Sequence, residues 1–80
     1  MSNQERLYNV FSSLFAIPAA TITDELSQDD VQQWDSFGTL NLVVGLEKEF
    51  NIQFDLLEIV GLKTVGITKT MLTEKGVQFD

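Results

Sequence analysis

Residues 33–50 read QWDSFGTLNLVVGLEKEF, and their apolar side chains recur at helical spacing. This segment predicts an amphipathic helix that begins at Asp35 or Ser36, because either side chain can cap the free N–H groups of a first turn. The pattern ends at Phe50, before Asn51, a residue type that tolerates the left-handed conformation at a helix C-terminus. The serine at the start of this helix is the first candidate for a functional residue.

The apolar arc of this helix is wider than one core contact requires. At about 100° per residue the apolar side chains cover roughly 220°, whereas a helix packed on one core needs an arc of little more than about 100°. Leu42, Val43, Leu46 and Phe50 form one stripe, and Phe37, Leu40 and Val44 form a second stripe beyond the direction of Ser36 and Glu47. The second stripe suits a docking surface, but periodicity alone favours a helix buried on two sides.

Three further helices are predicted, at about residues 3–16, 56–60 and 65–75. Ser2 with Glu5, and Asp55 with Glu58, have the spacing of capping boxes, and Thr64 can cap the last helix. The connection over residues 17–35 is long for a compact domain, and its spaced apolar residues predict that it is pinned across the helix ends. A single helical turn is expected within it, at residues 24–26 or 29–32.

The predicted fold is therefore all-α: one small four-helix bundle over residues 1–80 with a long loop between helices 1 and 2 and a short third helix. In the last helix the inner face is predicted at Ile67, Met71 and Leu72, and residues 77–80 are expected to be a frayed tail. Gly76 is expected to be a left-handed stop. The predicted core residues are Leu7, Phe11, Leu14, Leu42, Leu46, Phe50, Ile52, Phe54 and Met71.

Composition restricts the function. The chain has 80 residues, room for one domain, and a net charge of −7, which disfavours nucleic acid and anionic membranes. This charge either favours basic protein partners or serves solubility alone. The chain has no histidine and no cysteine, so it lacks an imidazole base and a thiol nucleophile. No apolar run approaches the roughly 18 residues of a membrane span. These features predict a non-catalytic, cytoplasmic protein without membrane insertion.

Two motifs carry a resemblance to a known family. Asp35-Ser36 is followed by a large apolar residue and by a helix ending Leu-Glu-Lys-Glu-Phe, and Thr64-Val65-Gly66 opens the last helix. Together with the order of the elements, these motifs resemble the acyl carrier proteins over nearly the whole chain. The resemblance implies a 4′-phosphopantetheine arm on Ser36, loaded from coenzyme A by a magnesium-dependent phosphopantetheinyl transferase. Its thiol would carry acyl intermediates as thioesters, and no metal site on this chain is implied.

The same resemblance assigns roles to neighbouring residues. Asp35 would help to set the helix start and meet the transferase, and partners would contact Phe37, Leu40, Val44 and Glu47. Leu40 could instead open onto a pocket for the acyl chain. The implied partners are acyl-transferring or acyl-modifying enzymes with basic docking surfaces, and a monomer is expected.

Departures from the family pattern bear on the pathway. Phe37 replaces the usual Leu or Met, Trp34 stands where many fatty-acid carriers have a small residue, and Asn41 and Lys48 lie on a helix that is often richer in acids. Fatty-acid, polyketide and specialised lipid pathways all stay open. Two rival functions stay open as well: an unmodified carrier-like module that docks partners through the second helix, and a small hydrolase with Ser36 as nucleophile, against which the absent histidine counts.

Overall fold

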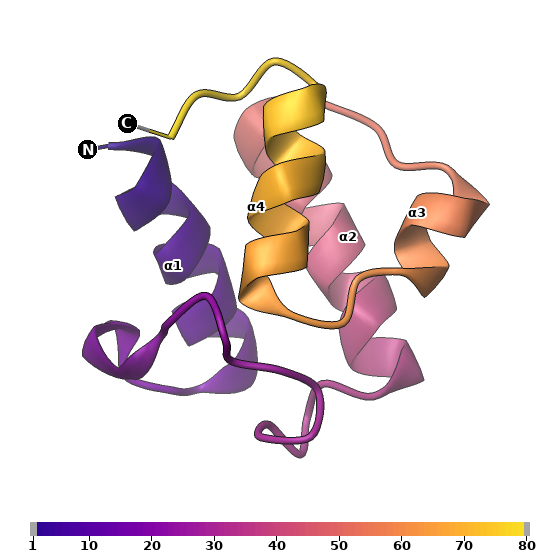
Figure 1. Ribbon diagram of the computed structural model, residues 1–80. Coiled ribbons are helices and arrows are strands. Elements are labelled where there is room, and N and C mark those ends of the chain that lie inside the picture. Colours follow the sequence, from indigo (N-terminus) through magenta and orange to yellow (C-terminus); the bar gives the residue numbers. More distant parts are fainter. Residues whose placement is uncertain (1, 80) are drawn as a thin grey trace.

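The computed structural model describes residues 2–79, which contain four α-helices and one 3-10 turn joined by loops (Figure 1). The helices are α1 (Asn3–Phe15), α2 (Ser36–Phe50), α3 (Leu56–Val60) and α4 (Val65–Glu74), and the turn η1 spans Ala19–Thr21. These residues contain no β-strand, only an isolated bridge between Ser27 and Thr64. The predicted small all-helical fold is confirmed. None of the helices in residues 2–79 has the length and apolar character that crossing a membrane would require.

Local capping determines where the helices begin. Ser2 Oγ accepts a hydrogen bond from the Glu5 amide at 3.1 Å, and Glu5 Oε1 accepts one from the Ser2 amide at 3.0 Å, which completes the predicted capping box. The hydrogen bond from the Ser2 backbone amide to the Glu5 carboxylate, followed by one from the Ser2 side chain, holds the pKa of Glu5 below its ordinary value. The predicted Asp55–Glu58 box and the Thr64 cap are also present.

Left-handed residues end the first two helices. The helix α1 ends at Phe15, one residue before the predicted end, because Ala16 adopts φ 55°. Asn51 ends α2 at φ 54°, and Gly76, at φ 99°, follows α4, both as predicted.

The core lies where α1, α2, α4 and the long connection meet. Of the predicted core residues, Leu7, Phe11, Leu42 and Leu46 are fully buried, whereas Leu14, Phe50, Ile52 and Phe54 are half-buried against them. Met71 is half-buried outside this cluster. The remaining members of the buried cluster are Phe15, Ile22, Val31, Trp34, Val65 and Leu72.

The predicted inner face of α4 was correct at Leu72, which is fully buried, and wrong at Ile67. The buried residues of α4 are Val65, Thr68 and Leu72, while Ile67 is 40% exposed. Thr68 can be buried because its hydroxyl donates to the Thr64 carbonyl at 2.9 Å. A polar residue with its own backbone acceptor therefore takes the place that an apolar pattern would assign to Ile67.

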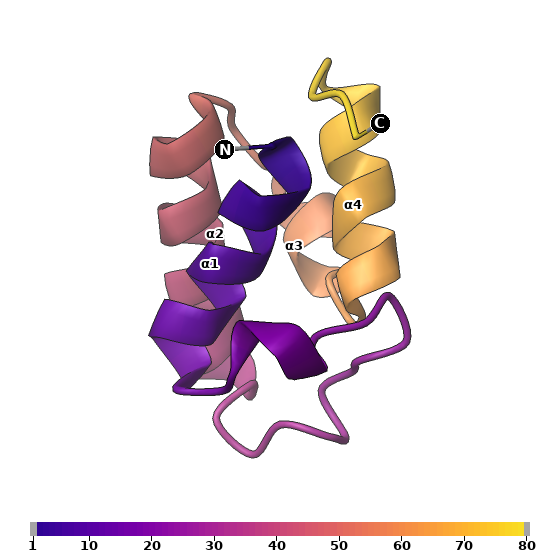
Figure 2. The same cartoon turned by 90° about the vertical axis from the view of Figure 1, so that its left-hand side faces the viewer.

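The long connection is held against the start of α4. The Val65 amide donates to the Leu26 carbonyl and the Gly66 amide to the Asp24 carbonyl, each at 2.9 Å. Lys69 Nζ adds an ion pair with Asp24 at 2.8 Å. Burial alone would lower the pKa of Lys69. The hydrogen bond to Asp24 and the nearby charges of Tyr8 and Asp24 together outweigh burial, so the pKa of Lys69 is raised above its ordinary value. In Figure 2 the connection runs from the lower end of α1 to the lower end of α4 and then returns to the start of α2.

The connection also differs from its prediction in one respect. Its 3-10 helix is η1, directly after Pro18, where none was predicted. The predicted positions hold only single hydrogen-bonded turns, in which the Leu26 amide donates to the Thr23 carbonyl and the Asp30 amide to the Ser27 carbonyl. Proline fixes its own backbone angle near the helical value, which suits a turn that begins at this point. As predicted, the spaced apolar residues pin the connection, since Ile22, Val31 and Trp34 are buried.

The expectation of a frayed C-terminal tail was wrong for residues 77–79, while Asp80 lies outside the described residues. The Gln78 carbonyl accepts a hydrogen bond from the Asn3 side chain at 3.0 Å, and Phe79 packs edge-on against Phe50. The segment therefore returns across the bundle to the start of α1, as Figure 1 shows.

Candidate functional site

Ser36 is the first residue of α2 and is exposed. Asp35 is the N-cap: its Oδ1 accepts a hydrogen bond from the Gly38 amide at 2.9 Å. Because Asp35 caps Gly38, the amides of Ser36 and Phe37 remain among the donors that a helix start leaves without intrahelical acceptors. Ser36 thus presents a hydroxyl beside free N–H groups and the positive end of the helix dipole.

Trp34 anchors the chain just before the serine. Its ring stacks on Phe15 with the centroids 5.7 Å apart and lies tilted against Phe11 at 5.2 Å. Its backbone amide donates to the Val31 carbonyl at 3.0 Å. Trp34 therefore fixes the approach of the connection to α2 by packing it on α1.

A cavity of about 340 Å³ opens beside Ser36, between α2 and α3. Leu40, Ile59 and Val60 give it apolar walls. Its remaining lining residues, Gln28, Ser36 and Thr39, are polar. Gln28 Nε2 donates to Thr39 Oγ1 at 3.3 Å and to the Leu62 carbonyl oxygen at 3.4 Å. The volume is near the lower end of the range of about 300–1,000 Å³ for small-molecule pockets.

The two apolar stripes predicted on α2 separate as expected. Leu42, Val43 and Leu46 are buried, and Phe50 is half-buried. Phe37, Leu40 and Val44 are 79%, 52% and 51% exposed. The prediction that periodicity alone favoured, a helix buried on two sides, was therefore wrong. The structure brings Phe37, Leu40 and Val44 together with Ser36 on one outward side of α2.

The Glu47 carboxylate is hydrogen-bonded within the protein. Its Oε2 accepts a hydrogen bond from the Phe54 amide at 2.9 Å, so this carboxylate holds the turn that follows α2. Glu47 is half-buried, and it stabilises the fold beside the exposed stripe of Phe37, Leu40 and Val44.

The helix α3 contributes surface residues that the sequence reasoning missed. Leu56, Leu57 and Val60 are 75%, 84% and 65% exposed, and only Ile59 and Val60 border the cavity beside Ser36. A signal was present in the sequence. Four apolar residues in a five-residue helix point in several directions, and a single turn cannot bury all of them on one core.

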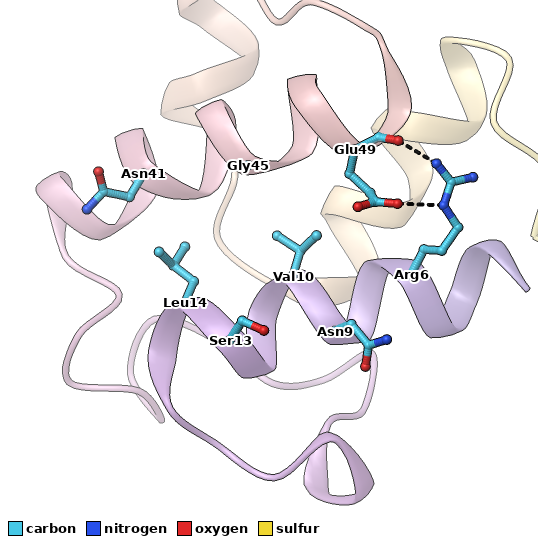
Figure 3. A pocket seen from close by; sticks show the side chains of 8 residues that line it. All are labelled: Arg6, Asn9, Val10, Ser13, Leu14, Asn41, Gly45 and Glu49. Carbon is cyan, nitrogen blue, oxygen red and sulfur yellow. Dashed lines mark hydrogen bonds and ion pairs between the residues drawn. The ribbon is translucent and has the colours of Figure 1, made fainter. Parts of the chain in front are cut away.

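A second hollow, of about 490 Å³, lies between α1 and α2 and does not include Ser36 (Figure 3). On α2 it is lined by Asn41, Gly45 and Glu49, a stripe distinct from Phe37, Leu40 and Val44. Arg6 spans one end, with its Nε 2.7 Å from Glu49 Oε2 and its Nη2 donating to the Glu49 carbonyl oxygen. The α1–α2 hollow is thus separate from the candidate site.

The groups around the Ser36 hydroxyl define what the site can do. The Ser36 hydroxyl has no hydrogen-bonded base among residues 2–79, and no group of three or more Asp and Glu side chains in that range could hold a metal ion. The arrangement presents an accessible hydroxyl, free amides and an apolar-walled cavity. Such a site can accept a covalent group and shelter part of it.

Comparison with known proteins adds no family to this description. No family model matches the chain, and no curated protein matches it either.

Proposed function

We propose that this chain is an acyl carrier protein that bears 4′-phosphopantetheine on Ser36. The observation that carries the proposal is the exposed Ser36 at the start of α2, which lines the same cavity as Leu40, Ile59 and Val60. The resemblance of Asp35-Ser36 and Thr64-Val65-Gly66 to the carrier motifs agrees with this placement.

The residues around Ser36 suit the attached group. A phosphodiester on Ser36 Oγ would lie at a helix N-terminus, where free amides and the helix dipole favour a negative charge. The attached group would supply a thiol that holds an acyl chain as a thioester. Leu40, Ile59 and Val60 can shelter the apolar part of such a chain, and the hydrophobic effect favours that burial.

Ser36 reacts only with the help of a partner. Its oxygen forms the new bond to the phosphorus of the phosphopantetheine half of coenzyme A, and the bond to the nucleotide half breaks. The serine proton passes to a base on the transferase, because this chain has no histidine and Ser36 has no hydrogen-bonded base among residues 2–79. The protein is then a substrate and carrier, and not an enzyme.

The intact mass of the purified protein tests this function. It is measured before and after incubation with coenzyme A, magnesium and a broad-specificity phosphopantetheinyl transferase. A gain of one phosphopantetheine, absent in Ser36→Ala, is the expected result. No gain on a folded protein, with an active control carrier, would overturn the proposal.

An unmodified docking module is the second candidate, and the exposed apolar residues of α2 and α3 favour it. Under that function Ser36→Ala leaves partner binding intact, whereas under the carrier function it abolishes all acyl transfer.

A further inference from the structure

The cavity beside Ser36 is not uniformly apolar. Besides its apolar walls on α2 and α3, it is lined by Gln28 from the long connection and by Thr39 from α2. Thr39 is only 7% exposed, and it follows Ser36 by three residues, so the two side chains are neighbours on one side of the helix. The cavity therefore combines apolar walls with hydrogen-bonding groups that are withdrawn from the surface.

The Thr39 hydroxyl is arranged differently from those of the other threonines within the α-helices. In α4 the hydroxyls of Thr68, Thr70 and Thr73 each donate to the carbonyl four residues earlier, at 2.9, 3.1 and 2.9 Å. Thr39 makes no such bond: its Oγ1 accepts from Gln28 Nε2 at 3.3 Å, and no group within residues 2–79 accepts its proton. Because a hydroxyl can donate as well as accept, Thr39 keeps one donor available to a group in the cavity.

Gln28 supplies the complementary group. Its Nε2 already donates to Thr39 Oγ1 and, at 3.4 Å, to the Leu62 carbonyl oxygen, which holds the half-buried side chain in place. Its Oε1 accepts no hydrogen bond from residues 2–79. The lining of the cavity thus offers one unused donor, the Thr39 hydroxyl, and one unused acceptor, the Gln28 amide oxygen.

On the carrier function proposed above, we infer that the cavity beside Ser36 selects a hydroxylated acyl chain over a saturated one, with Thr39 and Gln28 as the specificity-determining residues. A hydroxyl on the chain can accept from Thr39 and donate to Gln28, while the alkyl part lies on the apolar walls. A saturated chain would exclude water from both polar groups and leave them unpaired, which is unfavourable. Sites that hydrogen-bond a substrate hydroxyl discriminate strongly against the analogue without it for this reason.

Thermal unfolding of the loaded protein tests this inference. A broad-specificity phosphopantetheinyl transferase loads Ser36 from octanoyl coenzyme A or from 3-hydroxyoctanoyl coenzyme A, and the intact mass verifies each product. The two probes have the same chain length and differ by one hydroxyl. The Tm of the 3-hydroxyoctanoyl form is expected to exceed that of the octanoyl form by at least about 4 °C, the shift that one satisfied buried hydrogen bond produces in a domain of this size.

Substitutions in the cavity assign the effect to its polar groups. Thr39→Val removes the hydroxyl and is expected to abolish the difference in Tm, whereas Thr39→Ser keeps a hydroxyl and is expected to retain it. Gln28→Leu removes the acceptor and should reduce the difference independently of any change in α2. Thr70→Val, at an exposed position of α4, is the matched control and is expected to leave the difference unchanged. Far-UV circular dichroism verifies that each variant is folded.

The outcomes separate this inference from the carrier function. An octanoyl form at least as stable as the 3-hydroxyoctanoyl form would overturn the inference but leave the carrier function standing, because both forms were loaded. A preference that persists in both Thr39→Val and Gln28→Leu would also overturn it, since other groups would then select the chain. If the wild-type protein is never loaded, the carrier function fails and this inference fails with it.

Discussion

The carbonyl oxygen of Gln33 lies where a side chain at residue 38 would begin. A Cβ atom built on Gly38 would be only 2.1 Å from that oxygen and 3.1 Å from Cε1 of Phe15. Glycine at this position lets the segment before Asp35 fold closely over the first turn of α2. The close approach helps to fix the direction in which Ser36 leaves the connection and enters the helix.

Gly38→Ala is therefore expected to destabilise the protein and to slow loading of Ser36. Alanine favours a helix over glycine by about 1 kcal/mol, but the overlap with a backbone carbonyl forces the segment before Asp35 to move. Overpacking of this kind costs about 1–3 kcal/mol. Because the conflict is with backbone, we expect a net loss of about 1–2 kcal/mol in urea unfolding. Mass spectrometry of the loading reaction measures the effect on Ser36.

Gly45→Ala is the matched control for this prediction. Its Cβ would lie 3.3 Å from Cγ1 of Val10, a side chain beside the open α1–α2 hollow that can shift. The variant is expected to be as stable as the wild type or more so, by up to about 1 kcal/mol. Equal stability of Gly38→Ala and Gly45→Ala would show that the Gln33 contact does not constrain the helix start.

The sequence predicted the helices well because the signals that begin and end them are local. The caps at Ser2, Asp35 and Thr64 each act within three residues, so spacing alone identifies them. The position of Ser36, which depends on the cap at Asp35, was predictable for the same reason. The helix period also divided the apolar residues of α2 into two stripes, but it did not show that one of them is exposed.

Long-range contacts explain what the sequence did not predict. Nothing local indicates that the Gln78 carbonyl accepts a hydrogen bond from the Asn3 side chain. The cavity beside Ser36 likewise depends on how α3 lies against α2, and five residues of α3 carry no period that would define its inner side.

Val44→Asp tests the assignment of the exposed stripe. Val44 is exposed, so the free energy of unfolding should change by no more than about 0.5 kcal/mol, while the new charge weakens loading by the transferase. Leu42→Asp, two residues away and fully buried, should prevent folding, because it buries an unpaired charge. Loss of folding in Val44→Asp would mean that Val44 belongs to the core.

Trp34 is expected to be the side chain of the connection that stabilises the fold most. It packs on both Phe11 and Phe15, and Trp34→Ala should lose about 3–5 kcal/mol. Trp34→Phe should lose much less, because the indole Nε1 has no hydrogen-bond partner among residues 2–79 and only ring volume is removed. Thermal unfolding followed by far-UV circular dichroism compares the two variants. A similar loss of stability in both variants would contradict this prediction and indicate that Nε1 donates a stabilising hydrogen bond.

Glu58 should make the stability of the protein depend on pH in the acid range. The hydrogen bond from Lys75, followed by that from the Asp55 amide, holds the pKa of Glu58 below its ordinary value of 4.5. Folding then favours the ionised carboxyl, so its contribution is complete above pH 4.5 and is lost as the pH falls through the lower pKa of the folded state.

Glu58→Gln keeps the capping geometry but removes the charge. Its urea midpoint, followed by Trp34 fluorescence, should fall less than that of the wild type between about pH 6 and about pH 3. Lys75→Met, which removes the main cause of the shift, should behave in the same way, and equal acid sensitivity in all three proteins would rule out the Glu58–Lys75 pair as its source.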